Sequence, residues 1–206
     1  MNRDFGFVFK TLTILLLSVS VCVIIPQATF SAQPIIIDHT CTDIRQIPES
    51  AIDQAKTNLH IAYGHTSHGS QLTTGMTGLV DFANNGGLGL SLPTDIFAWN
   101  NGGVGGALDL HDTAMAGDVG YFPQWVNATK AYLDDPSHSD VNVIIWSWCG
   151  QVDDKYAAGT LDSEYLTPMS ELEAEYPGVR FVYMTGHVDH WNKMGTFYIL
   201  HVKQKV

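Results

Sequence analysis

The side chains best suited to chemistry in this sequence lie in one short polar turn, residues 64–70. The turn reads Gly-His-Thr-Ser-His-Gly-Ser and therefore holds two imidazoles and three hydroxyls. A serine at a sharp turn can act as a nucleophile when an imidazole takes its proton and backbone N–H groups stabilise the oxyanion. Gly64 and Gly69 let the backbone bend tightly on either side. Ser67 is therefore our candidate nucleophile of a hydrolase.

The segments that flank this turn predict its place in the fold. Residues 59–63, Leu-His-Ile-Ala-Tyr, have the apolar character of a short strand. Residues 72–82 repeat apolar side chains at the spacing of one helix face. The turn then joins the carboxyl end of a strand to the amino end of a helix, where α/β folds place their sites. The alternative is that the hydroxyls of Thr66, Ser67 and Ser70 only cap the helix.

A second polar turn carries the residues expected to activate this serine. Residues 185–190 read Thr-Gly-His-Val-Asp-His and follow the apolar run at residues 179–184. Either His187 or His190 is the expected general base, and Asp189 is the residue that would orient its imidazole.

A metal site is the rival interpretation of the same histidines. His65 and His68 are three residues apart, as are His187 and His190, and Asp189 and Asp112 are further potential ligands. Spacing of this kind arises easily by chance in a chain with nine histidines, and neither pair lies on an evident helix. We therefore predict no metal ion and no cofactor.

The composition indicates one globular domain. The chain has 206 residues, of which 45% are hydrophobic and only 15% charged, so it can bury a core and differs from disordered sequences. The formal net charge of −11 argues against binding to nucleic acid or to anionic membrane surfaces, because both interactions need clustered Lys and Arg.

The first 32 residues have the pattern of a secretory signal peptide. Arg3 and Lys10 precede an almost wholly apolar run at residues 11–25, and a proline and small residues follow it. A membrane anchor, the alternative, usually needs about 20 apolar residues. We predict a secreted or periplasmic domain at residues 33–206 with no stable membrane span after cleavage. Whether Cys41 and Cys149 pair in that compartment stays open.

Strands and helices alternate along the rest of the chain. Apolar runs predict strands at residues 59–63, 141–148 and 179–184, with a weaker one at residues 94–99. Periodicity and terminal residues predict helices at about residues 47–56, 72–82, 123–133 and 168–176. This order predicts an α/β fold with a mainly parallel sheet and helices on both faces. Residues 194–206 show no helical stripe, so they do not predict a closing C-terminal helix.

The carboxyl ends of parallel strands share one edge of the sheet. We expect that edge to gather Ser67, the glycine-rich loop at residues 100–106, and the polar turns at residues 149–154 and 185–190. The glycine-rich loop does not have the spacing of a dinucleotide fingerprint, and we interpret it as backbone that approaches another group closely. Residues 108–120 look irregular.

The run His-Thr-Ser-His-Gly at residues 65–69 resembles the first motif of the SGNH/GDSL-type hydrolases. The likeness is greatest to bacterial branches whose motif reads His-x-Ser-x-Gly, and it extends over about residues 58–190. The resemblance implies a flavodoxin-like, three-layer α/β/α fold and hydrolysis of ester or acetyl-ester bonds by a serine nucleophile.

Carried over by position, the resemblance makes Ser67 the nucleophile and Gly103 an oxyanion-donating glycine. The third motif, Gly-x-Asn-Asp, falls at residues 150–153 with valine in place of asparagine, so Gln151 is the substitute donor. The last motif, Asp-x-x-His, has no clean match, although residues 185–190 lie in the corresponding region.

The sequence therefore predicts an exported serine esterase that acts on a small-molecule or carbohydrate ester. His65 and His68 are expected to contribute to binding. Two alternatives stay open: a metal-dependent hydrolase that uses the histidine pairs, and a non-catalytic surface or carbohydrate-binding homologue. Tryptophans such as Trp99, Trp146 and Trp148 either stack a sugar or belong to the core.

Overall fold

A five-stranded parallel sheet forms the centre of the domain. The computed structural model describes residues 35–186. The strands lie in the order β2-β3-β1-β4-β5, and each neighbouring pair is parallel. Their bounds are β1 (His60–Gly64), β2 (Trp99–Asn100), β3 (Leu108–Asp112), β4 (Val143–Trp146) and β5 (Arg180–Val182). The predicted α/β class with a parallel sheet is confirmed.

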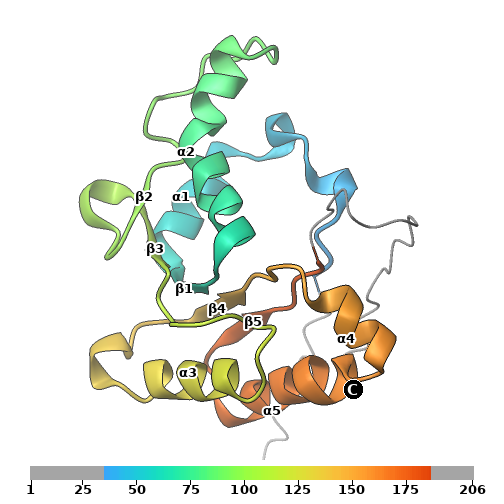
Figure 1. Ribbon diagram of the computed structural model, residues 1–206. Coiled ribbons are helices and arrows are strands. Elements are labelled where there is room, and N and C mark those ends of the chain that lie inside the picture. Colours follow the sequence, from blue (N-terminus) through green and yellow to red (C-terminus); the bar gives the residue numbers. More distant parts are fainter. Residues whose placement is uncertain (1–34, 187–206) are drawn as a thin grey trace, which may run out of the picture. The chain divides into compact units, whose positions relative to one another are not determined.

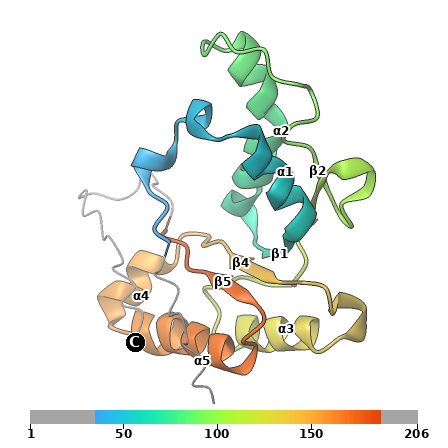
Figure 2. The ribbon, with the colours of Figure 1, turned by 180° about the vertical axis from the view of Figure 1, so that it is seen from behind.

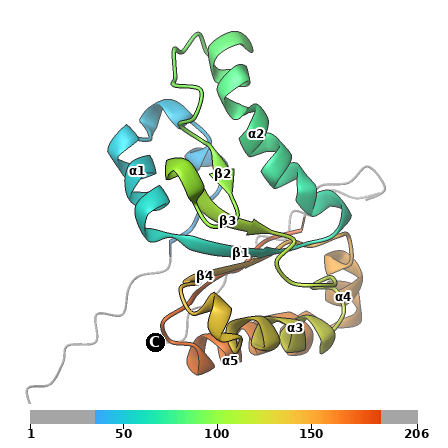
Figure 3. The same ribbon diagram turned by 90° about the vertical axis from the view of Figure 1, so that its left-hand side faces the viewer.

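Helices cover both faces of this sheet. The α-helices are α1 (Glu49–Asn58), α2 (Ser70–Asn85), α3 (Gln124–Leu133), α4 (Val152–Ala158) and α5 (Thr167–Glu175). Figures 1 and 3 show α1 and α2 on one side of the sheet and α3 and α5 on the other. The result is a flavodoxin-like three-layer α/β/α arrangement, in which β3-β1-β4-β5 follow the usual strand order and β2 extends the edge.

Shorter helical turns complete the connections. They are η1 (His39–Cys41), η2 (Ile44–Gln46), η3 (Ser67–Gly69), η4 (Val104–Gly106) and η5 (Pro136–His138), all 3₁₀, and the π-helical turn η6 (Asp162–Leu166). Of these, η3 lies between β1 and α2 and contains Ser67, the candidate nucleophile.

The core has two parts because side chains alternate between the faces of the sheet. The larger part packs Ala62, Ile144 and Trp146 from the strands against Trp125 of α3 and Leu172 of α5. Figure 2 shows β4 and β5 side by side with α5 beneath them. This face buries most of the apolar surface and fixes the sheet against α3 and α5.

The other part of the core is smaller. Ile61, Leu110 and Val143 form it, and Met76 of α2 packs against them. Ile61 and Ala62 are neighbours on β1, and their side chains pack in the two different parts of the core. This is expected for a strand that is covered on both sides.

Two of the tryptophans considered as sugar platforms belong to the core. Trp146 is fully buried and Trp148 is 1% exposed. Trp99 is half-buried at the sheet edge. The core interpretation is therefore confirmed for Trp146 and Trp148.

Three expectations about local structure are corrected. Residues 108–112, predicted as irregular, form β3, which is a neighbour of β1 in the sheet. Residues 152–154, predicted as the end of the polar turn at residues 149–154, are the first residues of α4. The weak strand predicted at residues 94–99 is reduced to the two residues of β2. In β3, acidic and imidazole side chains alternate with leucine, and their partners come from distant segments that local pattern does not reveal.

Several predictions concern residues outside the described range. These are the signal peptide at residues 1–32, the second polar turn from His187 onward and the tail at residues 194–206. Within residues 35–186, no helix is both long and apolar enough to cross a membrane. Cys41 and Cys149 are both free thiols, the first exposed and the second half-buried.

Candidate active site

Residues 64–70 form a tight corner between β1 and α2, here called the β1–α2 corner. Its two glycines are required by close approaches. A Cβ on Gly64 would lie 2.6 Å from the ring of Trp146, and one on Gly69 would lie 2.2 Å from the Cβ of His65. The expected sharp turn at the carboxyl end of a strand is therefore present, and packing on both sides fixes its path.

Ser67 occupies a strained position at this corner. Its φ is +41°, in the left-handed region that costs a residue with a Cβ about 1–2 kcal/mol. The side chain is exposed, and its Oγ forms no hydrogen bond with any residue between 35 and 186. Within this range, Thr113 at the end of β3 is the one other non-glycine residue with positive φ. Such strain concentrates at functional sites.

The three hydroxyls of the corner do not cap the helix. Thr66 Oγ1 donates to Asp118 Oδ2 at 2.6 Å, and Ser70 Oγ donates to the carbonyl oxygen of Ser67 at 2.9 Å. Neither η3 nor α2 has a side-chain hydrogen bond at its N-cap. The alternative that these hydroxyls only cap the helix is therefore wrong. Helix capping does not account for the strained conformation of Ser67.

His65 anchors the corner to the neighbouring strand. Its Nε2 lies 2.7 Å from Asp112 Oδ1, and because an ionised carboxylate only accepts, Nε2 carries the proton. The imidazole is buried, with 5% of the side chain exposed, and its Nδ1 has no partner among the described residues. His65 therefore acts as a positioning residue that links the ends of β1 and β3.

Asp118 provides a second anchor from the loop after β3. It is 6% exposed, and besides Thr66 it accepts the backbone N–H of Gly120 at 2.7 Å. Tyr63 adds a third contact, because its OH donates to the carbonyl oxygen of Gly69 at 2.8 Å. Burial, reinforced by the negative charge of Asp112, raises the pKa of Tyr63 and keeps this phenol a neutral donor.

The roles of Asp112 and Asp118 at the corner are not predicted from the sequence, which indicates Asp112 only as a possible metal ligand and gives Asp118 no role. Both side chains reach the corner from positions 47 and 52 residues further along the chain. The available signal was the pair of leucines alternating with polar residues at 108–112, which is the period of a strand. Read as a strand, this segment would have brought both acids to the edge where Ser67 lies.

Gln151 lies next to this assembly. Its side-chain amide packs so closely on Gly120 that a Cβ there would be 2.6 Å from Gln151 Cδ. Gly120 and Gln151 line a surface pocket of about 370 Å³ together with Asp154, Lys155 and Glu164. Gln151 therefore contacts the Asp118–Gly120 segment, which anchors the corner through Thr66.

Gly103 lies elsewhere, and its predicted role beside Ser67 is wrong. A Cβ on Gly103 would be 3.3 Å from the Cβ of Asp109, which pairs with His60 at the start of β1. The loop leaves the sheet here because β2 ends level with the first residues of β1 and β3. The corner begins about four residues further along, or about 13 Å.

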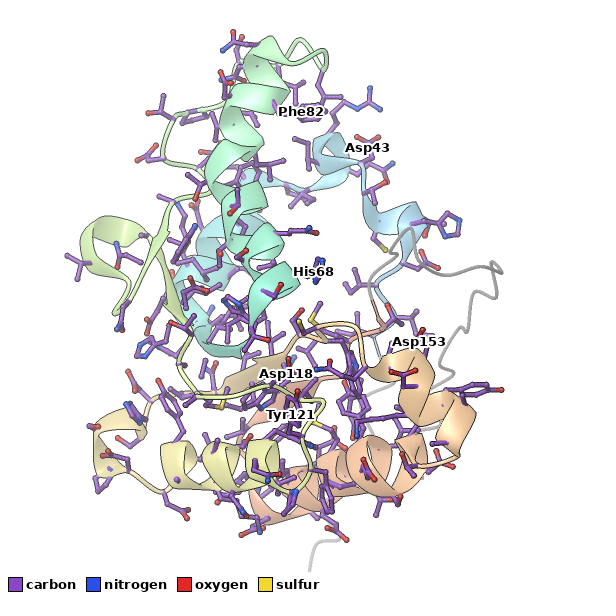
Figure 4. All side chains as sticks on the ribbon, viewed as in Figure 1. Asp43, His68, Phe82, Asp118, Tyr121 and Asp153 are labelled. Atoms are coloured by element: carbon purple, nitrogen blue, oxygen red, sulfur yellow. The ribbon has the colours of Figure 1, made fainter. Side chains whose placement is uncertain are left out.

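The remaining predicted site residues divide into two groups. His68 is exposed, and Figure 4 shows it beside the first turn of α2, above Asp118 in this view. His187, Asp189 and His190 lie outside the described residues. Comparisons with protein-family models, with curated proteins and with solved structures gave no match for this chain. Any function assigned to this protein therefore rests on its sequence and on the geometry of the corner.

Proposed function

We propose that this protein is an SGNH-like serine hydrolase that cleaves ester or acetyl-ester bonds, with Ser67 as the nucleophile. The observation that carries the proposal is the exposed, strained Ser67 at the carboxyl edge of a parallel sheet, with an Oγ that bonds no residue between 35 and 186. Buried contacts of His65 and Asp118 hold the turn in this conformation. Backbone strain of this kind clusters at active sites, which supports a functional role for Ser67.

In the proposed reaction, Ser67 Oγ attacks the carbonyl carbon of the ester while an imidazole takes its proton. His187 or His190 is proposed as the base, since both follow in sequence β5, whose carboxyl end lies at the same edge of the sheet as that of β1. The backbone N–H of Ser67, at the amino end of η3, is proposed as an oxyanion donor. The alcohol leaves with the proton, and water then hydrolyses the acyl-serine to release the acid.

The proposed substrate is a small-molecule or carbohydrate ester. The pocket beside the corner is lined by the polar side chains Gln151 and Asp154 and by the ion pair of Lys155 and Glu164. These side chains can form hydrogen bonds with a hydroxylated part of a substrate. No cofactor enters this chemistry, because the nucleophile, base and oxyanion donors all come from the chain.

We further propose that the domain is exported to the periplasm or the medium after loss of its signal peptide. The support is the sequence pattern of residues 1–32. Mass spectrometry of protein recovered outside the cytoplasm tests this directly. The expected mass corresponds to a chain that begins near residue 33, whereas an intact amino terminus would contradict cleavage.

Turnover of p-nitrophenyl acetate by the purified protein tests the nucleophile. We expect Ser67→Ala to lower kcat/KM by at least about 10³-fold, because the covalent step is lost. Ser70→Ala is the matched control, since it removes a hydroxyl that only bonds the Ser67 carbonyl, and it should change the rate by less than about threefold. Full activity in Ser67→Ala, or no activity in the unmutated protein, would contradict the proposal.

A further inference from the structure

A second group of polar side chains lies at the opposite end of β1 and β3, here called the amino-end cluster. It consists of His60, Asp109 and Asp140, which come from β1, β3 and the turn before β4. His60 Nδ1 lies 2.8 Å from Asp109 Oδ2 and 3.7 Å from Asp140 Oδ2. One donor atom from each residue lies within 4.8 Å of the other two, so the three can face a single point.

We propose that the amino-end cluster binds a divalent transition-metal ion of the zinc class. Tetrahedral Zn²⁺ holds imidazole nitrogen and carboxylate oxygen at about 2.0–2.2 Å, which puts neighbouring ligand atoms about 3.4 Å apart. The two distances from His60 Nδ1 lie on either side of that value. The carboxylate oxygens of Asp109 and Asp140 lie within 4.8 Å of each other, so an ion fits after side-chain movements of about 1–1.5 Å, with a water molecule as the fourth ligand.

The buried ligand is already held in place by outer contacts. Asp109, with 6% of its side chain exposed, accepts through Oδ1 from Gly102 N–H at 2.7 Å, and His111 Nε2 lies 3.2 Å away. The other nitrogen of His111 is 2.7 Å from Tyr132 OH. Partners of this kind orient a metal-binding carboxylate and leave Oδ2 directed at the ion. The glycine-rich loop thus has a reason to approach Asp109 closely.

The other two ligands give the ion access from solvent. The side chains of His60 and Asp140 are 34% and 61% exposed. Two carboxylates with one imidazole supply the charge that a divalent cation neutralises, and the nitrogen donor favours Zn²⁺ and its neighbours over Mg²⁺ or Ca²⁺. The ion would join the amino ends of β1 and β3 to the chain entering β4, about 13 Å from the β1–α2 corner. Its role is structural and independent of the proposed ester hydrolysis.

Zinc titration of chelator-treated protein by calorimetry tests this inference. We expect Asp140→Asn and His60→Gln each to weaken the binding of one Zn²⁺ equivalent by at least about tenfold. Asp53→Asn, the same charge change at an exposed position on α1, should leave the affinity unchanged. Circular dichroism checks that each variant is folded, and the exposure of Asp140 makes its variant the most informative.

Three results would overturn the inference. The first is an unmutated protein that binds no Zn²⁺. The second is an Asp140→Asn variant that binds one Zn²⁺ equivalent as tightly as the unmutated protein does. That result would assign the ion to other histidines. The third is Mg²⁺ binding as tight as that of Zn²⁺, which would contradict a site selected by its imidazole.

Discussion

Two His–Asp pairs join β1 to β3 at opposite ends, and they differ in which partner is buried. At the β1–α2 corner, His65 Nε2 lies 2.7 Å from Asp112, and at the amino-end cluster, His60 Nδ1 lies 2.8 Å from Asp109. At the corner the imidazole is 5% exposed and the carboxylate 32%. At the amino end the imidazole is 34% exposed and the carboxylate 6%.

This reversal gives the same two residue types different uses. The buried imidazole of His65 anchors a turn and so presents Ser67, whereas the buried carboxylate of Asp109 presents an oxygen beside two exposed groups. Burial alone would raise the pKa of Asp109, but hydrogen bonds from His60 and the Gly102 N–H outweigh it, and the net pKa is lowered. In each proposed site the buried partner would support the arrangement, and the exposed groups would contact the ligand.

Matched substitutions of the two histidines should show the largest difference between the two His–Asp pairs. We expect His65→Ala to lower the free energy of unfolding by about 2–4 kcal/mol, because it leaves a cavity and an unpaired Asp112. His60→Ala should cost about 1 kcal/mol, since its imidazole is partly solvated. Urea denaturation measures both. Equal losses would show that burial does not distinguish the two pairs.

Two glycine substitutions, one in the corner and one in α2, test how tightly the corner is packed. Gly69→Ala should destabilise by about 1–3 kcal/mol, because its Cβ would overlap the Cβ of His65. Gly78→Ala on α2 meets no atom within 4 Å and should stabilise by about 0.5–1 kcal/mol through helix propensity. Thermal unfolding compares the two. A neutral Gly69→Ala would mean that the corner is not tightly packed.

The buried phenol of Tyr63 predicts a pH dependence at the corner. A tyrosine whose pKa is raised by folding contributes stability that is present below about pH 10 and lost as the pH rises through the folded value. Tyr63→Phe should therefore cost about 1 kcal/mol at neutral pH, through the lost bond to Gly69, and reduce the alkaline loss. Urea midpoints measured from neutral pH to about pH 11 test this. An unchanged alkaline slope would contradict it.

Removal of metal ions by a chelator should have the smallest effect on ester hydrolysis, because the amino-end cluster and the β1–α2 corner lie at opposite ends of β1. EDTA should leave the turnover of p-nitrophenyl acetate unchanged, since the reaction at Ser67 uses no metal ion. The same treatment should lower the melting temperature of protein that was first loaded with Zn²⁺. Loss of turnover with EDTA, restored by Zn²⁺, would instead favour the metal-dependent hydrolase.

The sequence predicted those parts of the fold that depend on local pattern. The apolar run at residues 59–63 and the helical spacing at residues 72–82 locate β1, α2 and the turn between them. Residues 108–112 were missed because their polar side chains are satisfied only by distant partners, such as His60 for Asp109. Local propensity does not register pairing across 49 positions.

The candidate site shows the same division. Ser67 was predicted because strand, turn and helix follow one another in the sequence. Asp112 and Asp118 were not assigned to it because they reach the corner through sheet pairing and a loop, which have no local signature. Gly103 was expected beside Ser67, but β2 is only two residues long and ends level with the start of β1. The register of the strands sets this position, and the sequence does not reveal the register.

Labelling with a fluorophosphonate tests the central claim most directly, because the probe reacts only with an activated serine. We predict that the purified protein is labelled, that peptide mass mapping places the probe on Ser67, and that Ser67→Ala abolishes the reaction while Ser70→Ala retains it. Labelling that is unchanged in Ser67→Ala, or found on another residue, would contradict the account.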